Sequence, residues 1–305
     1  MEYLNSIKDM IGNTPILKIT NFDLPANVNL YAKLEMYNPL GSVKDRIGSY
    51  LIGDAVRNGL KLGGTIILAT AGNTGIGTAV AALGSKYRLI VVVPDKFSRE
   101  KQSLMRALGA EIINTPRADG MLGAERKAEE LAKEIEGSVI INQFESEGNP
   151  RAHYETTGPE IYRQMDGKID YFVAGAGSGG TFSGVLKFLK EKDPSIKGVL
   201  ADPYGSIIGG GEHADYDIEG IGNDFIAATM NTDYIDEVVK ITDEEAFNMA
   251  KELAKREGVI GGSSTGAALT AALRFARTLQ DQEREYNIVT LFPDSGERYH
   301  SKNLL

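Results

Sequence analysis

The sequence contains no cysteine and no tryptophan, and it has only three histidines, His153, His213 and His300. Without cysteine the chain has no disulfide, no thiol nucleophile and no cysteine-ligated metal. No two histidines are four residues apart, the spacing that would place both on one face of a helix. We therefore expect no metal site.

Basic residues are scarce relative to acidic ones. The chain has 33 Lys and Arg residues against 42 Asp and Glu residues, which gives a formal net charge of −9. Nucleic-acid binding needs a basic face, so this balance argues against it. No apolar run approaches the length that spans a membrane, and the N-terminal MEYLNSIKDMIGNTP resembles no signal peptide. We therefore expect a cytoplasmic protein that does not bind membranes.

The 305 residues are enough for two modest domains. Short apolar segments rich in β-branched residues alternate with longer segments of helical periodicity. The segments expected as strands are 65–70, 88–94, 111–115, 139–144, 171–177, 197–203, 238–243 and 287–294. Such strands are typical of a parallel sheet that is covered on both faces, so the sequence predicts an α/β fold. Its ligands should bind beyond the carboxyl ends of the strands.

A lysine stands where a helix is expected to begin. In NPLGSVKDR, Ser42 and Asp45 have the spacing of a capping box, and the helical pattern IGSYLIGDAV follows. Lys44 would then lie in the first turn, where the helix dipole lowers the pKa of an ammonium group. Many such lysines are simply exposed to solvent. A lysine with a lowered pKa is, however, also what Schiff-base chemistry needs.

A glycine-rich loop, GAGSGGT at residues 175–181, lies between an expected strand and an expected helix. Glycines let backbone N–H groups surround a phosphate at the start of a helix. The glycines also fit G-x-G-x-x-G, and Asp202 follows Gly180 by 22 residues. A nicotinamide-dependent oxidoreductase is therefore one alternative, and a purely structural turn is another.

A second loop, TAGNTG at residues 70–75, also joins a strand to a helix. Its backbone donors and the side chains of Thr70, Asn73 and Thr74 suit a carboxylate better than a bulky phosphate. Asn73 could also donate to a phenolate-like oxygen. Gln143, at the end of another expected strand, could hold a ligand carboxylate, or it could simply fix a turn.

A third loop, GGSSTG at residues 261–266, precedes a helical segment. Around Ser264 it fits the G-x-S-x-G pattern of hydrolases, with Asp294 and His300 following in the hydrolase order. Only 39 residues follow the loop, too few for the strands and helices that separate these groups in that fold. Ser263 or Ser264 could instead be a neutral hydrogen-bonding partner or an N-cap.

One cofactor, pyridoxal phosphate, would use all of these groups together. It needs a lysine, a phosphate cradle, partners for its ring oxygen and ring nitrogen, and a site for the substrate carboxylate. The motifs concerned are IGNTP, NPLGSVKDR, TAGNTG, HYETTGPEI, GAGSGGT, EGIGNDFI, GGSSTGA and PDSGERY. Through them the chain resembles, over nearly its whole length, the fold type II pyridoxal-phosphate enzymes of the cysteine synthase and cystathionine β-synthase branch.

The resemblance implies a role for each matching position. Lys44 would carry the cofactor as an imine and move protons at the substrate α-carbon. The other cofactor contacts would be Asn73, Gly177, Ser178, Gly179, Gly180, Thr181 and Ser263. The substrate contacts would be Thr70, Ala71, Asn73, Thr74, Gln143, Glu219 and Gly220. Ala71 stands where the family commonly has serine, and Ser178 where it commonly has threonine.

The resemblance also implies a tryptophan synthase β-like architecture, with the active site in the cleft between two open parallel-sheet domains. The larger domain, residues 1–37 and 145–305, would bind the cofactor phosphate. The smaller domain, residues 38–144, would bind the substrate carboxylate and close on the substrate. A homodimer is the implied assembly.

The implied reaction is β-replacement on O-acetylserine or serine through an aminoacrylate intermediate. Homocysteine, sulfide or both would be the acceptor, giving cystathionine or cysteine. EGIGNDFI, with Glu219 and Asp224, is more similar to cystathionine β-synthases than to the QGIG of cysteine synthases. Glu219 could hold the amino group of homocysteine, or it could be a solvated loop charge, which leaves a sulfide-specific cysteine synthase as the alternative. The compact bacterial type is the best match, which favours O-acetylserine as the donor.

Overall fold

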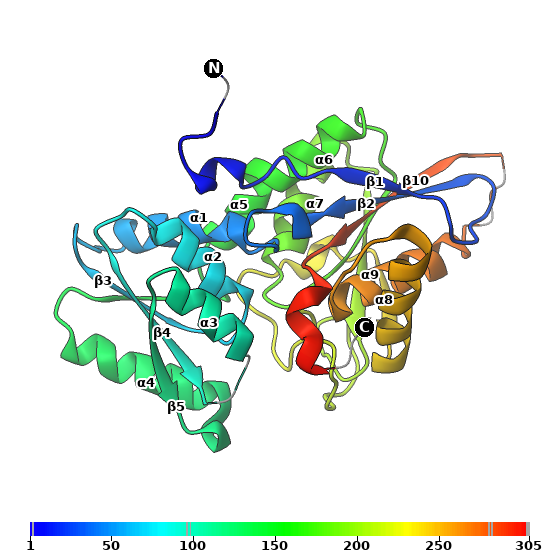
Figure 1. The fold of residues 1–305 in the computed structure, drawn as a ribbon. Helices are drawn as coiled ribbons and strands as arrows, with labels where there is room; N and C mark the ends of the chain where they lie inside the picture. The colour runs from blue at the N-terminus through cyan, green and yellow to red at the C-terminus, as the bar shows by residue number, and fades with distance from the viewer. Residues whose placement is uncertain (2, 96, 98, 280, 282, 303–305) are drawn as a thin grey trace.

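The molecule contains two separate β-sheets, a smaller one on the left and a larger one on the right in Figure 1. The computed structural model describes residues 1, 3–95, 97, 99–279, 281 and 283–302. The larger sheet consists, in spatial order, of β1 (Ile16–Ile19), β2 (Val28–Leu34), β10 (Tyr286–Phe292), β7 (Tyr171–Gly175), β8 (Lys197–Pro203) and β9 (Glu237–Ile241). The smaller sheet consists of β5 (Glu111–Thr115), β4 (Arg88–Pro94), β3 (Thr65–Ala69) and β6 (Val139–Ile141).

Helices cover both sheets (Figure 1). Those around the smaller sheet are α1 (Asp45–Arg57), α2 (Asn73–Ala82), α3 (Arg99–Ala107) and α4 (Gly120–Glu134). The other α-helices are α5 (Gly148–Ala152), α6 (Gly158–Gln164), α7 (Gly180–Lys192), α8 (Asp243–Glu257) and α9 (Ser263–Ala276). A π-helical turn, His153–Thr157, joins α5 to α6. Short 3-10 helices lie at Ile7–Met10, Glu35–Tyr37, Arg117–Asp119, Thr232–Tyr234 and Gly296–Lys302.

The predicted α/β class with parallel sheets is confirmed. Strand β10 pairs in parallel with β2 and β7, and the strands of the smaller sheet are parallel to one another. The eight strands expected from the sequence all form, although β6 ends at Ile141 rather than at residue 144. Strands β1 and β2 were not expected from the sequence. Strand β1 pairs antiparallel with β2 at the edge of the larger sheet.

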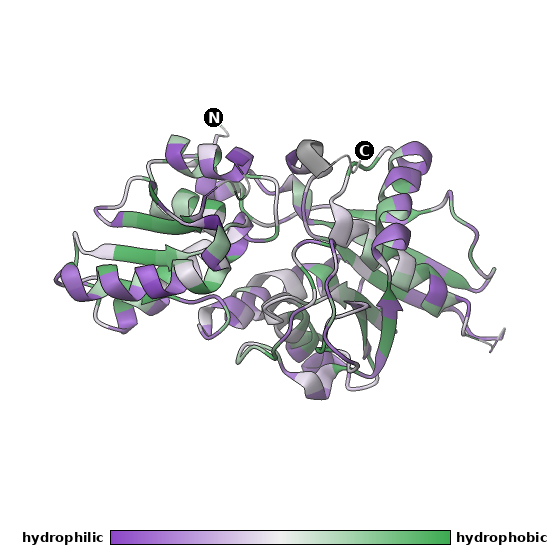
Figure 2. Ribbon diagram, turned by 90° about the horizontal axis from the view of Figure 1, so that it is seen from below, coloured by the Kyte–Doolittle hydropathy of each residue, from purple (hydrophilic) through white to green (hydrophobic). Residues whose placement is uncertain are grey.

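Successive residues of the central strands face two different hydrophobic cores. In β7, Phe172 packs into the core that contains α7 residues, and Val173 packs into the opposite core with α9. In β3, Ile66 and Leu68 pack with α1 and α2, whereas Ile67 packs with α4. Because both faces are buried, these strands are apolar throughout, as the colouring of Figure 2 shows.

The local sequence of helix α8 explains where the helix begins and ends. The Thr242 side chain accepts a hydrogen bond from the backbone N–H of Glu245, and the Glu245 carboxylate accepts one from the N–H of Thr242. These two hydrogen bonds form a capping box. Gly258 ends the helix in a left-handed conformation with φ of 69°, which glycine adopts without steric strain.

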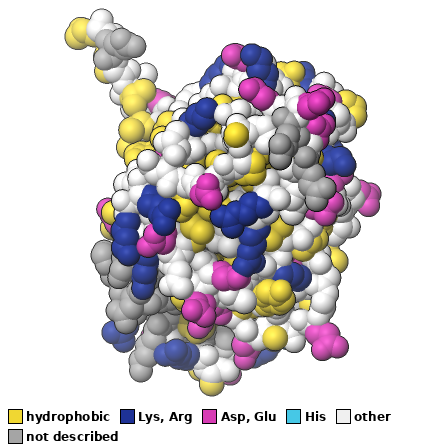
Figure 3. Space-filling model, turned by 90° about the vertical axis from the view of Figure 1, so that its right-hand side faces the viewer, with side chains coloured by type: hydrophobic (Ala, Val, Ile, Leu, Met, Phe, Trp, Pro, Cys, Tyr) yellow, Lys and Arg dark blue, Asp and Glu magenta, His cyan; other side chains and the backbone are white. Residues whose placement is uncertain are grey.

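Charged side chains are dispersed over the surface. Figure 3 shows basic and acidic groups interspersed with apolar ones on one face, and the N-terminal segment extending from the body. Within the described part of the chain, none of the helices combines the length and the apolarity needed to cross a bilayer.

Candidate active site

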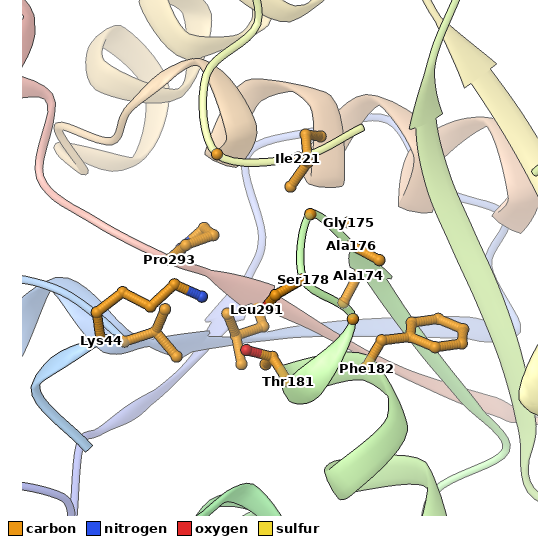
Figure 4. A pocket seen from close by; sticks show the side chains of 14 residues that line it. Lys44, Ala174, Gly175, Ala176, Ser178, Thr181, Phe182, Ile221, Leu291 and Pro293 are labelled. Carbon is orange, nitrogen blue, oxygen red and sulfur yellow. The ribbon is translucent and has the colours of Figure 1, made fainter. Parts of the chain in front are cut away.

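A cavity opens beyond the carboxyl ends of β7 and β10, where the sequence predicts ligand binding (Figure 4). Lys44 extends into it from the start of α1. The wall opposite is formed by the glycine-rich loop after β7 and by the first turn of α7. Other lining residues are Val43, Gly220, Ile221, Leu291 and Pro293. The cavity therefore brings together Lys44 and the loop predicted to bind phosphate.

Lys44 lies at the N-cap position, because α1 begins at Asp45. The predicted capping box between Ser42 and Asp45 is wrong. Ser42 Oγ accepts from the backbone N–H of Lys44 at 3.3 Å, and the Asp45 carboxylate accepts from the N–H of Leu40 at 2.6 Å. Burial lowers the pKa of Lys44 to about 8, with Asp294 opposing the shift. The predicted direction of the shift is thus confirmed, but burial is its main cause.

A glycine contact fixes α2 against the lysine. A Cβ atom at Gly77 would lie only 2.1 Å from the backbone oxygen of Lys44, so no other residue fits without displacing the backbone. A Cβ atom at Gly48 of α1 would lie 2.0 Å from the Gly77 oxygen. The two helices touch at these glycines, which places the TAGNTG loop at the start of α2 beside Lys44.

The loop at residues 177–181 has the shape of an anion cradle. Gly179 has φ of 80°, and Gly180 begins α7, whose first N–H groups have no acceptor within the helix. A Cβ atom at Gly180 would lie 2.1 Å from Asn149 Oδ1, and one at Gly177 would lie 2.7 Å from the Gly220 oxygen. The loop thus requires glycine so that its backbone can approach its surroundings closely.

Asn149 joins this loop to a predicted carboxylate site. Its amide nitrogen donates to the backbone oxygen of Gln143 at 2.7 Å and to the Ser178 hydroxyl at 2.9 Å. The Thr74 hydroxyl donates to Gln143 Oε1 at 2.5 Å. Gln143 and Thr74, predicted to serve the same carboxylate, are therefore in contact. Thr70 is buried, and its hydroxyl accepts from the N–H of Gly72 within the loop.

Asn73, predicted to contact the ring oxygen, is held by two residues near the C-terminus. Its Nδ2 donates to Asp294 Oδ2 at 2.8 Å, and its Oδ1 accepts from Arg298 at 2.8 Å. The Tyr299 hydroxyl donates to the same Asp294 oxygen at 2.5 Å. Burial raises the pKa of Asp294, although Tyr299, Lys101 and Asn73 act in the opposite direction.

Ser263 and Glu219 are also neighbours. Ser263 is buried at the start of α9, and its hydroxyl accepts from the backbone N–H of Glu219 at 3.0 Å. The Glu219 carboxylate forms an ion pair with Lys101 of α3 at 3.0 Å. Lys101 also lies over the ring of Tyr299, 4.8 Å from its centroid. Glu219 is therefore part of a charged network and not an isolated solvated charge.

A buried ionic cluster packs behind the lysine. Arg46 donates to both oxygens of Glu35, at 2.7 and 2.8 Å, and to both oxygens of Glu160, at 2.8 and 2.7 Å. Lys33 donates to Glu160 at 2.8 Å. Because Arg46 is two residues from Lys44, this cluster ties the beginning of α1 to β2 and α6.

The sequence comparisons agree with this geometry. A family model described as pyridoxal-phosphate dependent enzyme matches residues 7–294. The chain belongs to this family. An O-acetylserine dependent cystathionine beta-synthase of Bacillus subtilis (strain 168) is 52% identical over 305 residues, covering 100% of this chain and 98% of the relative. A cysteine synthase of Helicobacter pylori (strain ATCC 700392 / 26695) is 47% identical over 307 residues, covering 100% and 99%.

Solved structures of this family have the same fold. The crystal structure of an O-acetylserine dependent cystathionine beta-synthase from Helicobacter pylori matches with a TM-score of 0.92 and 46% identity. The match covers 100% of this chain and 99% of the Helicobacter pylori chain. The predicted resemblance to the cysteine synthase and cystathionine β-synthase branch, with fold type II architecture, is therefore confirmed.

The residues present fit pyridoxal phosphate, the cofactor of this family of enzymes. The glycine-rich cradle and Lys44 line one cavity, so a phosphate and an aldehyde of the same small molecule could reach both. Asp294 follows Pro293 of the cavity lining; its pKa is raised by burial, and its Oδ1 has no hydrogen-bond partner among the described residues.

The competing interpretations of two motifs do not hold in this enzyme. Asp202, considered for a nucleotide ribose, is buried, forms an ion pair with Lys240 at 2.6 Å and accepts from the N–H of Gly209. Ser264, considered as a hydrolase nucleophile, is buried in the first turn of α9. The His300 side chain, its presumed base, lies outside the described part of the structure.

Sequence reasoning gave no role to Tyr299, Arg298, Lys101 or Arg46, and it considered Asp294 only for a hydrolase. Four of them do lie within quoted motifs: Arg46 in NPLGSVKDR, and Asp294, Arg298 and Tyr299 in PDSGERY. Apart from Asp294 and Tyr299, which bond each other within one motif, their partners lie in other motifs or segments, and no local pattern points to them.

Proposed function

We propose that this enzyme catalyses β-replacement on O-acetylserine, with homocysteine, sulfide or both as the acceptor, to give cystathionine or cysteine. The observation that carries the proposal is the shared cavity of Lys44 and the 175–181 loop, in which the pKa of Lys44 is about 8. The relatives named for these reactions support the same chemistry.

The cofactor would be held by groups from both sheets. The phosphate would bind in the cradle at residues 177–181, Lys44 would bind the aldehyde carbon, and Asn73 would donate to the ring oxygen. Ser263 already accepts from the N–H of Glu219, so its own hydroxyl hydrogen can be given to the ring nitrogen. When bound, pyridoxal phosphate supplies an electron sink for negative charge at the substrate α-carbon.

Lys44 would act as the acid and base at the substrate α-carbon. A pKa near 8 lies close to physiological pH, so both the neutral and the protonated amine are populated and the side chain can take up a proton and return it. Burial maintains that pKa, and Asp294 prevents it from falling further. The contact of Gly77 with the Lys44 backbone holds the start of the side chain in place.

The substrate carboxylate would bind at the start of α2. The Thr74 and Gln143 side chains, already in contact, would share it with Thr70 and the backbone at Ala71. The helix N-terminus at Asn73 favours a negative charge there. Gly220 has φ of 86° and lines the cavity, so it would form the wall beside the substrate.

The acceptor site would be at Glu219. The backbone N–H of Glu219 donates to Ser263, and its carboxylate binds Lys101, so an incoming ammonium group could replace Lys101 as the partner of the carboxylate. Homocysteine carries such a group and sulfide does not. Glu219 would therefore favour homocysteine.

Replacement of Lys44 tests the proposed reaction. We expect Lys44→Ala to lose turnover and the visible absorption of a lysine-bound cofactor, because the variant has no amine at this position. The control is Lys61→Ala, since Lys61 is exposed and away from the cavity. Absorption spectra before and after addition of O-acetylserine report both properties. Normal turnover by Lys44→Ala would contradict the proposal.

Replacement of Glu219 tests the acceptor. We expect Glu219→Gln to reduce kcat/KM for homocysteine by about tenfold, the loss typical of one charge-assisted hydrogen bond, with little change for sulfide. Glu212→Gln changes an exposed acid seven positions earlier in the chain and serves as the control. Equal losses with both acceptors would show that Glu219 does not hold the amino group.

We also propose the domain division 1–37 plus 145–305 and 38–144, with the smaller domain closing on the substrate, and a homodimeric assembly. The ion pair of Lys101 with Glu219 and the hydrogen bond of Asn73 to Asp294 support closure, since each joins the two proposed domains.

The N-terminal segment supports the proposed dimer. Its Tyr3 and Leu4 side chains are 71% and 58% exposed, and burial of such side chains would favour dimerisation. Sedimentation analysis would measure the assembly.

A further inference from the structure

His153 is a buried polar residue that the reaction described above does not use. It lies in the π-helical turn between α5 and α6 and is 0% exposed. Both of its ring nitrogens are engaged: Nδ1 lies 2.9 Å from Thr157 Oγ1, and Nε2 lies 3.1 Å from Thr181 Oγ1. Thr181 is the last residue of the proposed phosphate cradle and lines the cavity with Lys44 (Figure 4).

The surrounding helices hold His153 in this position. A Cβ atom at Gly184 of α7 would lie 2.8 Å from the His153 Cβ and 2.2 Å from the Pro150 oxygen, so the two helices are in close contact. π-Helical turns are rare and occur frequently at functional sites. The local backbone therefore directs the imidazole at the start of α7.

The imidazole is neutral. Burial lowers the pKa of His153 to about 3, and Lys44 and Arg46 contribute to the shift. A neutral imidazole has one N–H donor and one acceptor nitrogen, so its two hydrogen bonds must run in the same direction.

The two possible directions differ in what Thr181 presents to the cavity. If the hydrogen is on Nδ1, it is donated to Thr157, and the Thr181 hydroxyl must donate to Nε2. Thr181 then offers only lone pairs to the cavity. If the hydrogen is on Nε2, Thr157 donates to Nδ1, Nε2–H donates to Thr181, and the Thr181 hydroxyl hydrogen points into the cavity. A phosphate accepts hydrogen bonds, so it requires the second arrangement.

We propose that His153 is a positioning residue that turns the Thr181 hydroxyl hydrogen toward the cofactor phosphate, with Thr157 donating to Nδ1 in the arrangement that the phosphate requires. The inference rests on the proposed phosphate role of residues 177–181. It adds a chain of three residues, Thr157, His153 and Thr181, whose first two members do not themselves touch the cofactor.

The test compares pyridoxal phosphate with pyridoxal, which lacks the phosphate, in binding to the apoenzyme. We expect His153→Phe to weaken binding of pyridoxal phosphate about tenfold, as for loss of a hydrogen bond to a charged acceptor. Binding of pyridoxal should not change. The ³¹P resonance of the bound cofactor should shift, and His153→Gln, which keeps an N–H donor, should restore most of the affinity and the resonance position.

A double-mutant cycle tests whether His153 acts through Thr181. In a Thr181→Val background, His153→Phe should cause no further loss of affinity. Additive losses would overturn the proposal, and so would equal losses for pyridoxal and pyridoxal phosphate, because both would mean that His153 only fills space. If Thr181→Val binds pyridoxal phosphate as tightly as the unmodified chain, the assignment of the cradle itself is wrong.

Thr157→Val provides a second variant with a smaller structural change. It removes the hydrogen bond to Nδ1 that stabilises the Nε2–H tautomer, so we expect about threefold weaker binding of pyridoxal phosphate alone, the low end for one hydrogen bond. Circular dichroism verifies the fold of each variant. If His153→Phe fails to fold, unchanged affinity in Thr157→Val would still refute the tautomer argument.

Discussion

Glu35 and Asp294 are both buried carboxylates near the start of α1, but they are partnered very differently. Burial alone would raise the pKa of Glu35, yet Arg46 and Thr14 lower it to about 2. Asp294 accepts from two neutral groups through one oxygen, and burial raises its pKa. Within the part of the chain that the structure describes, its other oxygen has no hydrogen-bond partner.

The difference distinguishes a cluster that stabilises the fold, around Glu35, from a carboxylate beside the proposed binding site, Asp294. The cluster around Glu35 satisfies its charges completely, so a ligand has little to add and the cluster acts as a fixed base for α1. The charge and hydrogen bonding of Asp294 are incompletely satisfied, and its neighbour Asn73 is a proposed cofactor contact. A ligand that binds Asn73 would therefore change the environment of Asp294, whereas that of Glu35 would stay the same.

The largest effect should follow from breaking the satisfied cluster. We expect Arg46→Met to lower the free energy of unfolding by about 3–5 kcal/mol, because it leaves Glu35 and Glu160 buried without their main cation. Urea denaturation measures this loss. Arg88→Met is the control, since Arg88 pairs with Glu111 where both side chains are about half exposed (47% and 53%). Similar losses in the two variants would remove the distinction between the buried and exposed pairs.

Replacement of Asp294 should change the free energy of unfolding by a smaller amount and in the opposite direction. Because its folded-state pKa is raised, wild-type stability falls as pH rises from about 3.8 through that pKa, and Asp294→Asn should escape this fall. At pH 7 the apo variant should therefore be more stable than wild type, and at low pH the advantage should vanish. Denaturation of both proteins at a series of pH values measures the difference, and a constant difference would contradict the assignment.

The same variant should change Lys44. Asp294 raises the pKa of Lys44 against the effect of burial, so Asp294→Asn should move that pKa below about 8. The neutral amine reacts with pyridoxal phosphate, so the rate of cofactor uptake by the apoenzyme, measured against pH, should shift its midpoint downward.

The smallest effect on stability should come from Lys101. We expect Lys101→Met to lower the free energy of unfolding by less than about 1 kcal/mol, because Glu219 is partly exposed to solvent. Its KM for homocysteine should nevertheless decrease, since the variant removes a competing cation from Glu219. Glu219→Gln should raise the same KM, so shifts of the same sign in both variants would exclude competition for this carboxylate.

The strands and binding loops could be predicted because their signals are local. Strand β4 has the predicted bounds, Arg88–Pro94, since an apolar run in a doubly covered sheet is read directly from composition. Strand β6 stops early because Asn142 Oδ1 accepts from the N–H of Phe144 and begins a turn.

The features that could not be predicted depend on contacts between residues that are distant in the sequence. Strand β2 contains Lys33, which is 0% exposed and interrupts the apolar pattern. Its charge is satisfied by Glu160, more than a hundred residues away. The contacts of Asp294 with Asn73 and of His153 with Thr181 are likewise made by tertiary folding, and no spacing in the sequence identifies them.

The π-helical turn His153–Thr157 also sets the rotation of α6 relative to α5 about the axis of the continuous helical segment that the three form. Each residue advances an α-helix by about 100°, so the turn's wider winding rotates α6 relative to α5. With this offset, His153 faces Thr181 of the cofactor loop while Glu160 faces Arg46 and Lys33. Deleting one residue from the turn would restore regular α-helical winding. The helical segment could then direct His153 at Thr181 or Glu160 at Arg46 and Lys33, but not both.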